Sequence, residues 1–135
     1  MMDHVAIMKK SWGLIPKILS GEKTIESRWY MARYPPWNRI YAGDIVYFKD
    51  SGEPVTARAE VSKVLQFRDL TPRKVREILD TYMKGSFYSL FEKKKYCMLI
   101  LLKNPCAVEP FKINKSGFGI SAAWMCVPDI NKIKA

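Results

Sequence analysis

The spacing of apolar residues predicts a strand and then a helix at the start of the chain. Residues 4–10 place Val5 and Ile7 on one face, which is typical of a short strand. Residues 11–23 carry apolar side chains at helical spacing: Leu14, Ile15, Ile18 and Leu19. We expect this helix to end at Gly21, because glycine is favoured just after a helix C-terminus.

Residues 21–29, "GEKTIESRW", predict a second strand that the chain enters directly from this helix. Side chains alternate between the two faces of a strand, so Thr24, Glu26 and Arg28 should share one face. The other face then carries Ile25, Ser27 and Trp29.

The middle of the chain predicts two strands joined by a turn. The strands are residues 45–49 and 55–67, and the turn is "DSGEP" at 50–54. Val64 breaks the parity that the second strand sets with Ala57, Ala59 and Val61. We therefore expect a β-bulge near residues 62–63.

Residues 70–83 are the clearest predicted helix. Thr71 can cap its N-terminus, Pro72 suits the first helical position, and Leu70 can pack onto Val75. The predicted buried stripe is Val75, Ile78, Leu79 and Tyr82, and the charged residues between them should face solvent.

The remaining segments complete an α+β pattern. Pro35-Pro36 excludes regular structure over 33–44, and residues 89–103 should end as a buried strand. Two last strands are expected at 107–114 and 121–127, followed by a short closing helix or tail. Strands and helices do not alternate regularly, which argues against a doubly wound parallel sheet. We expect a small mixed or antiparallel β-barrel with two or three helices, forming one domain over 1–135.

Charge adds a constraint on the partner. The 135 residues include 23 Lys and Arg against 13 Asp and Glu, which gives a net charge of +10. Such an excess favours polyanions, with nucleic acid ahead of an anionic membrane surface, although it can also serve solubility alone.

Cysteine and histidine usage predicts neither a metal site nor a cofactor. The single histidine is His4, and the three cysteines form no CxxC pair: Cys97, Cys106 and Cys126. Unpaired thiols favour a reduced, cytoplasmic location. The longest apolar run, 96–102, is too short to cross a bilayer, so we expect no membrane association.

The charged strand is the first candidate site. Residues two apart on a strand lie roughly 6.6 Å apart, so the Glu26 and Arg28 side chains can meet. Arg28 offers a planar fork to phosphate or a base edge, Lys23 a flexible positive charge, and Glu26 an acceptor for an exocyclic amine. The alternative is an ion pair that only fastens the strand to the helix end.

Two further segments carry candidate ligand-binding residues. In "RWYMARYPPWNRIY", arginines interleave with aromatic rings that could stack on bases, and the candidates are Trp29, Arg33, Trp37 and Arg39. In "NKSGFG", the backbone around Lys115, Ser116 and Gly117 could hold a phosphate. The alternatives are aromatic residues that cap the core and a tight turn between strands.

The stretch "GEKTIESR" matches the GxKxxExR signature of the ASCH domain (activating signal cointegrator homology), a branch of the PUA-like superfamily. "IPKILSGEKTIESRW", "AGDIVYFKDSG" and "INKSGFGISAAWMCV" also resemble segments of that family. The resemblance implies a PUA-like β-barrel with a cleft lined by Gly21, Lys23, Glu26 and Arg28.

The same resemblance implies binding of RNA or of a modified nucleotide. Some small bacterial members hydrolyse the amide of acetylated cytidine with a Lys, a Thr and a distant Glu. Lys23 stands at the Lys position, but Glu26 occupies the Thr position, and Thr24 lies at the wrong offset. We therefore expect a binding module, with two alternatives: an amidohydrolase that uses Lys23 as its catalytic base, or an adaptor for a protein partner. The sequence predicts no oligomeric state.

Overall fold

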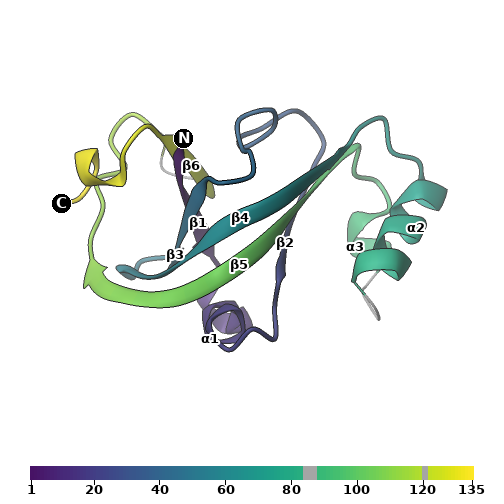
Figure 1. The fold of residues 1–135 in the computed structure, drawn as a ribbon. Helices are drawn as coiled ribbons and strands as arrows, with labels where there is room; N and C mark the ends of the chain where they lie inside the picture. Colours follow the sequence, from purple (N-terminus) through teal and green to yellow (C-terminus); the bar gives the residue numbers. More distant parts are fainter. Residues whose placement is uncertain (84–87, 120–121) are drawn as a thin grey trace.

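Six strands form one mixed sheet in the computed structural model, which describes residues 1–83, 88–119 and 122–135 (Figure 1). The strand order is β2-β5-β4-β3-β1-β6. The strands are β1 Asp3–Met8, β2 Ile25–Tyr30, β3 Ile45–Asp50, β4 Val55–Phe67, β5 Tyr96–Phe111 and β6 Trp124–Val127. The helices are α1 Leu14–Leu19, α2 Pro72–Tyr82 and α3 Tyr88–Phe91, with 3-10 turns at Lys10–Trp12 and Ile130–Lys132.

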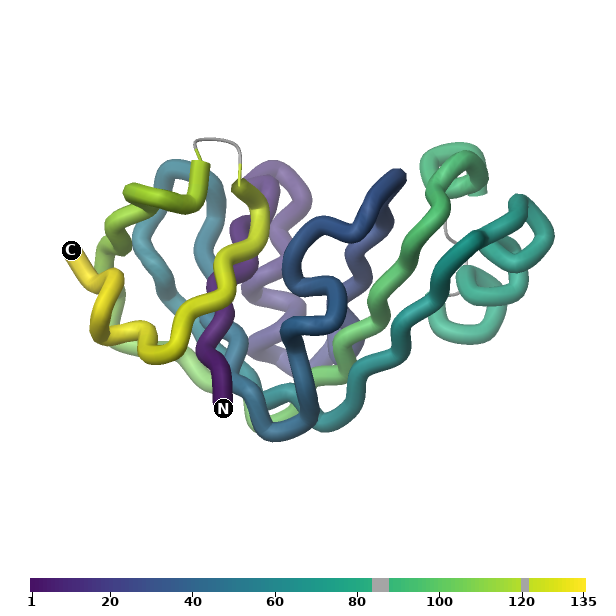
Figure 2. The backbone as a smooth tube through the Cα atoms, turned by 90° about the horizontal axis from the view of Figure 1, so that it is seen from above, coloured from purple at the N-terminus to yellow at the C-terminus, as the bar shows by residue number. Residues whose placement is uncertain are grey.

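The sheet curls, and α1 lies between its two ends (Figures 1 and 2). β1 pairs in parallel with β3, and the other neighbours pair antiparallel. β2 and β6 are the edge strands. The curl therefore leaves an open side between these two edges, and this is where the site described below is found.

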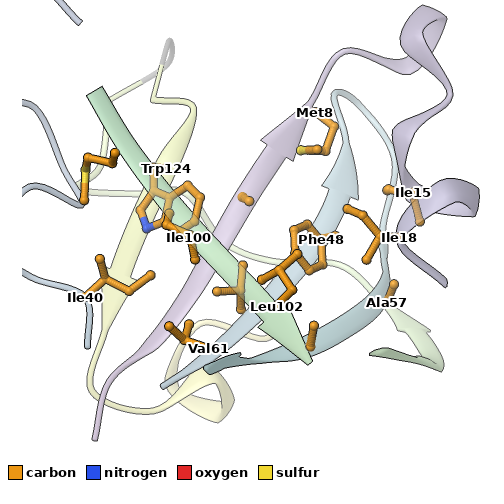
Figure 3. Packing of buried hydrophobic residues seen from close by; sticks show 14 residues of the cluster. Met8, Ile15, Ile18, Ile40, Phe48, Ala57, Val61, Ile100, Leu102 and Trp124 are labelled. Carbon is orange, nitrogen blue, oxygen red and sulfur yellow. The ribbon is translucent and has the colours of Figure 1, made fainter. Parts of the chain in front are cut away.

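The inner face of the curled sheet holds the largest core. It gathers alternate residues of the strands together with Ile15 and Ile18 of α1, as Figure 3 shows: Met8, Phe48, Ala57, Val61, Ile100, Leu102 and Trp124. Burying one such side chain contributes roughly 1.5–3 kcal/mol. The short helix thus closes the inside of the sheet with two isoleucines.

A second core lies on the outer face, where α2 and α3 cover β5 and β2. Thr71 caps α2 by accepting from the Lys74 amide, as predicted, and Leu70 and Val75 are buried in the same cluster. The expectation that Tyr82 is buried was wrong: this residue is the last of the helix and is 37% exposed.

β4 and β5 stay paired along their length because the ladder contains bulges. One of the register shifts lies between Val61 and Lys63, which confirms the predicted bulge. The separate strand expected at 107–114 was wrong, since β5 continues to Phe111 past Asn104, whose φ is 51°. The bulges take up the extra residues, so the proline that follows Asn104 does not end the strand.

Two other boundaries differ from the prediction. β2 starts at Ile25 rather than at Gly21, because Gly21 adopts a φ of 83° and the Lys23 amide donates back to Lys17. The predicted last strand begins at residue 121, which lies outside the described residues, and β6 covers its second half. The stretch 33–44 is irregular, as expected.

The α+β class is the one predicted from the sequence, and the predicted small mixed β-barrel takes the form of a curled six-stranded sheet with two edge strands. Among the described residues, no helix has the length and apolar character needed to cross a membrane.

Candidate functional site

Arg28 bridges the open side of the sheet, from edge strand β2 to edge strand β6. Its Nη1 donates to the carbonyl oxygen of Ala123 at 3.4 Å, and its Nη2 lies 3.6 Å from Met8 Sδ. Its guanidinium carbon lies 5.0 Å from the centre of the Trp124 ring, within the range of a cation–π contact. The guanidinium is therefore held against β6 and the end of β1.

A buried carboxylate lies beside this guanidinium. Glu26 is 5% exposed, and its Oε1 is 3.5 Å from Arg28 Nε. Its Oε2 is 4.0 Å from Lys23 Nζ, which donates to the Ile25 carbonyl at 2.7 Å. We call the group formed by Lys23, Glu26 and Arg28 the seam site. The structure brings together all three residues that the sequence singled out in this strand.

Two atoms of the seam site are buried without a hydrogen-bond partner among the described residues. They are Glu26 Oε2 and Arg28 Nε. Leaving a buried polar atom unsatisfied costs about 1–3 kcal/mol, and more for charged groups, so most proteins satisfy such atoms. Unused hydrogen-bonding capacity is therefore concentrated at this position.

The two-residue period of β2 explains why these charges meet and why Trp29 does not join them. Trp29 points to the opposite face, where it is buried in the outer core and stacks on Phe91 with ring centres 4.8 Å apart. Its ring is therefore not presented at the seam site. Thr24 precedes the strand and is exposed.

The proline-rich loop is fastened to the sheet. The Asn38 amide donates to Gln66 Oε1 at 2.8 Å, and Gln66 Nε2 donates to Asn38 Oδ1 at 2.8 Å. Trp37 is half-buried, packs on the inner core and meets Tyr96 edge-on. The exposed aromatic residues of the loop are instead tyrosines, Tyr34 at 57% and Tyr41 at 62%.

The two arginines predicted in this loop lie at its surface. Both Arg33 and Arg39 are exposed. The Arg33 guanidinium carbon is 5.9 Å from the centre of the Tyr96 ring. Within the described part of the chain, no hydrogen bond or ion pair joins either arginine to Lys23, Glu26 or Arg28, so the structure does not place them in the seam site.

The glycine-rich loop lines two depressions. Lys115, Ser116, Gly117 and Gly119 line one of about 500 Å³. Lys115 also lines another of about 320 Å³, together with Met8, Lys9, Ser51, Ala122 and Ala123. Met8 and Ala123 both contact Arg28 as well, so the smaller depression lies next to the seam site. Gly117 adopts a φ of 87°, which fits the alternative of a tight turn as well as it fits a backbone that holds a phosphate.

A buried hydrogen-bond network, from Trp124 through His4 to Asp44, fixes the position of the Trp124 ring. Trp124 Nε1 donates to His4 Nδ1 at 3.0 Å, so the other ring nitrogen of His4 carries the proton and donates to Asp44 Oδ2 at 2.9 Å. Burial lowers the pKa of His4 below its ordinary value, although Asp44 acts in the opposite direction. Sequence reasoning missed Met8, Asp44 and Trp124, since no local pattern links residues 20 to 120 positions apart.

Comparisons of the sequence with known proteins give no relative. A scan against protein-family models finds no match, and no curated protein matches by sequence.

Solved structures do match over nearly the full chain. Two variants of ZmASCH from Zymomonas mobilis align with TM-scores of 0.69 and 0.68, at 15% and 16% identity. They cover 96% of this chain in both cases, and 93% and 91% of their own chains. The ASCH protein from the same organism aligns with a TM-score of 0.64 at 16% identity, over 91% of this chain and 85% of its own. The chain therefore has the fold of an ASCH domain, as its "GEKTIESR" signature predicted.

Proposed function

We propose that this protein binds RNA, or a single nucleotide with an ordinary or modified base, at the seam site. The observation that carries the proposal is a buried carboxylate between two cations, with two unsatisfied polar atoms, on the open side of the sheet. A purely structural ion pair gains little from unsatisfied buried atoms, because their desolvation is not compensated. A ligand that supplies both a donor and an acceptor would compensate it.

The chemistry of the three residues suits the edge of a nucleobase. A carboxylate such as Glu26 accepts from an exocyclic amine, as carboxylates do from cytosine N4. Arg28 and Lys23 can donate to carbonyl or ring-nitrogen acceptors on the same base. The exposed cations and tyrosines of the loop, Arg33, Arg39, Tyr34 and Tyr41, could extend the contact along a single strand.

The net charge of +10 agrees with a polyanionic ligand. Affinity for a single strand should then fall with salt, with a log–log slope of about −0.7 for each phosphate contact. If the protein is instead an adaptor for a protein partner, its own binding to nucleic acid should be weak and insensitive to salt.

Fluorescence anisotropy with a labelled single-stranded RNA of ten nucleotides tests this proposal. Arg28→Lys keeps the charge but loses the planar fork, so it should weaken binding about tenfold or more. The matched control is Arg73→Lys on α2, which should bind like the wild type. No binding of the wild type to RNA or to nucleotides at low salt would overturn the proposal.

The hydrolase alternative has its own readout in the same tubes. Incubation with N4-acetylcytidine would reveal turnover, and Lys23→Ala should abolish it if Lys23 is the catalytic base. The structure provides no specific support for this alternative, because Thr24 is exposed and Lys23 Nζ already donates to the backbone.

A further inference from the structure

Lys49 is a largely buried lysine on the outer face of β3. Lys49 as a whole is 7% exposed, and its backbone pairs in register with Ile7 of β1. The described residues offer its ammonium group neither a hydrogen bond nor an ion pair within 4 Å. Lysine is rarely this buried unless it is paired, because desolvation of the charge is costly.

Charges of both signs lie around Lys49, and among the described residues none of them forms an ion pair with it. Burial lowers the pKa of Lys49, and the positive charge of Lys115 lowers it further. Asp50 and Glu53 act in the opposite direction, but Glu53 is paired with Lys10 at 2.7 Å. Two lysines that repel each other, one of them buried, form a site that an anion would stabilise.

The 320 Å³ depression lies beside these lysines. Ile7, the register partner of Lys49, lines it, and so does Ser51, two residues after Lys49. Lys9 and Lys115 line it as well, and Lys115 Nζ donates to the Ala122 carbonyl at 3.4 Å. The lining therefore includes one serine and two lysines, residue types whose hydroxyl and ammonium groups suit phosphate oxygens.

We propose that this depression, with Lys49 beside it, binds a phosphate group of the same ligand whose base enters the seam site. Met8 and Ala123 belong to both places, since they line the depression and contact Arg28. The inference rests on the proposed function and narrows it: the ligand is a nucleoside phosphate or an RNA strand, rather than a free nucleoside.

Calorimetric titrations with cytidine and with cytidine 5′-monophosphate test the proposal. The wild type should prefer the monophosphate by about tenfold or more, because charge-assisted hydrogen bonds to the phosphate add to the base contacts. Lys49→Met should reduce that preference towards one while leaving the affinity for cytidine unchanged. The matched control is Lys63→Met, at an exposed position of β4, which should keep the full preference. If Lys49→Met loses affinity for cytidine and for cytidine 5′-monophosphate by the same factor, the proposal is overturned.

A second measurement does not depend on the base. Inorganic phosphate, compared with chloride at equal ionic strength, should raise the Tm of the wild type and of Arg28→Lys, but not that of Lys49→Met. Methionine in place of a largely buried lysine that makes no ion pair should not prevent folding. Phosphate that raises the Tm of the wild type, together with an affinity for RNA that Arg28→Lys leaves unchanged, would refute the proposed function at the seam site and keep the phosphate site. No effect of phosphate on the wild type would overturn the phosphate site.

Discussion

The seam site and helix α2 contain the same three kinds of charged residue in nearly the same arrangement. On α2, Glu77 Oε1 lies 3.7 Å from Arg73 Nε, and Glu77 Oε2 lies 3.5 Å from Lys74 Nζ. At the seam, the corresponding distances from Glu26 are 3.5 Å to Arg28 and 4.0 Å to Lys23. Figure 1 shows α2 at the outer end of the sheet, away from α1.

Burial is what separates the two groups. The Glu77 side chain is 53% exposed and that of Arg73 is 91% exposed, whereas those of Glu26 and Arg28 are 6% and 13% exposed. Exposed pairs are screened by water and contribute about 0–1 kcal/mol. Buried groups carry a desolvation cost that their mutual attraction must offset. Similar distances therefore describe a solvated helix surface in one place and a candidate binding site in the other.

The largest expected difference is in stability. Arg28→Met leaves the Glu26 carboxylate buried with only Lys23 near it, and breaking a buried pair in this way costs about 3–5 kcal/mol. Arg73→Met should change the free energy of unfolding by less than about 0.5 kcal/mol. Urea denaturation of both variants measures the difference, and equal effects would remove the distinction between the two groups.

A double-mutant cycle sharpens the comparison by isolating each pair. Glu26→Gln with Arg28→Met should give a coupling energy of about 1–3 kcal/mol, because the two residues share a buried environment. Glu77→Gln with Arg73→Met should give about 0.3–0.5 kcal/mol, as exposed helix pairs do. A coupling at the seam no larger than that on α2 would contradict the account.

Acid should lower the free energy of unfolding through His4, which accepts a hydrogen bond from Trp124 beside the seam site. The pKa of His4 is lowered in the folded protein, so the unfolded chain binds a proton more readily below the ordinary value of 6.5. The stabilisation is therefore present above pH 6.5 and is lost as the pH falls towards the lowered pKa. His4→Gln should flatten this part of the stability profile, measured by urea denaturation from pH 7.5 to pH 5. An unchanged slope would show that His4 does not cause it.

Thiol reactivity offers the smallest test. Cys126 packs against the inner core near the seam, and burial raises its pKa to about 11, whereas Cys106 is exposed on β5. A disulfide reagent at pH 8 should modify Cys106 first, because the thiolate is the reactive form. Cys106→Ser should remove the fast phase. A fast phase that persists in this variant would mean that the inner face is open to the reagent.

The sequence allowed the seam residues to be predicted, but not the wall opposite them. The two-residue period of the strand placed Glu26 and Arg28 on one face, and the 3.6-residue period of α2 placed Arg73 in solvent. The contact between Arg28 and Ala123 spans 95 residues and depends on how the sheet curls. Such contacts follow from the tertiary fold, which no local pattern encodes.

Lys49 illustrates the same limit. As the last residue of the predicted strand at 45–49, it has no feature in the sequence that marks it as buried. The structure shows Ile113 and Phe118 packed on the same face of the sheet, with Tyr47 and Val5. Ile113 and Phe118 come from a segment more than sixty positions after Lys49, and no local pattern in the sequence predicts that this segment packs on the same face as Lys49.

The central claim is that the seam site binds a nucleotide while the similar charges on α2 do not. Titration of ¹⁵N-labelled protein with cytidine 5′-monophosphate, followed by NMR, tests it most directly. The account predicts amide shifts concentrated at residues 23–28 and 123–124, with residues 72–82 unaffected. Absence of shifts at millimolar ligand, or shifts as large on α2 as at the seam, would contradict it.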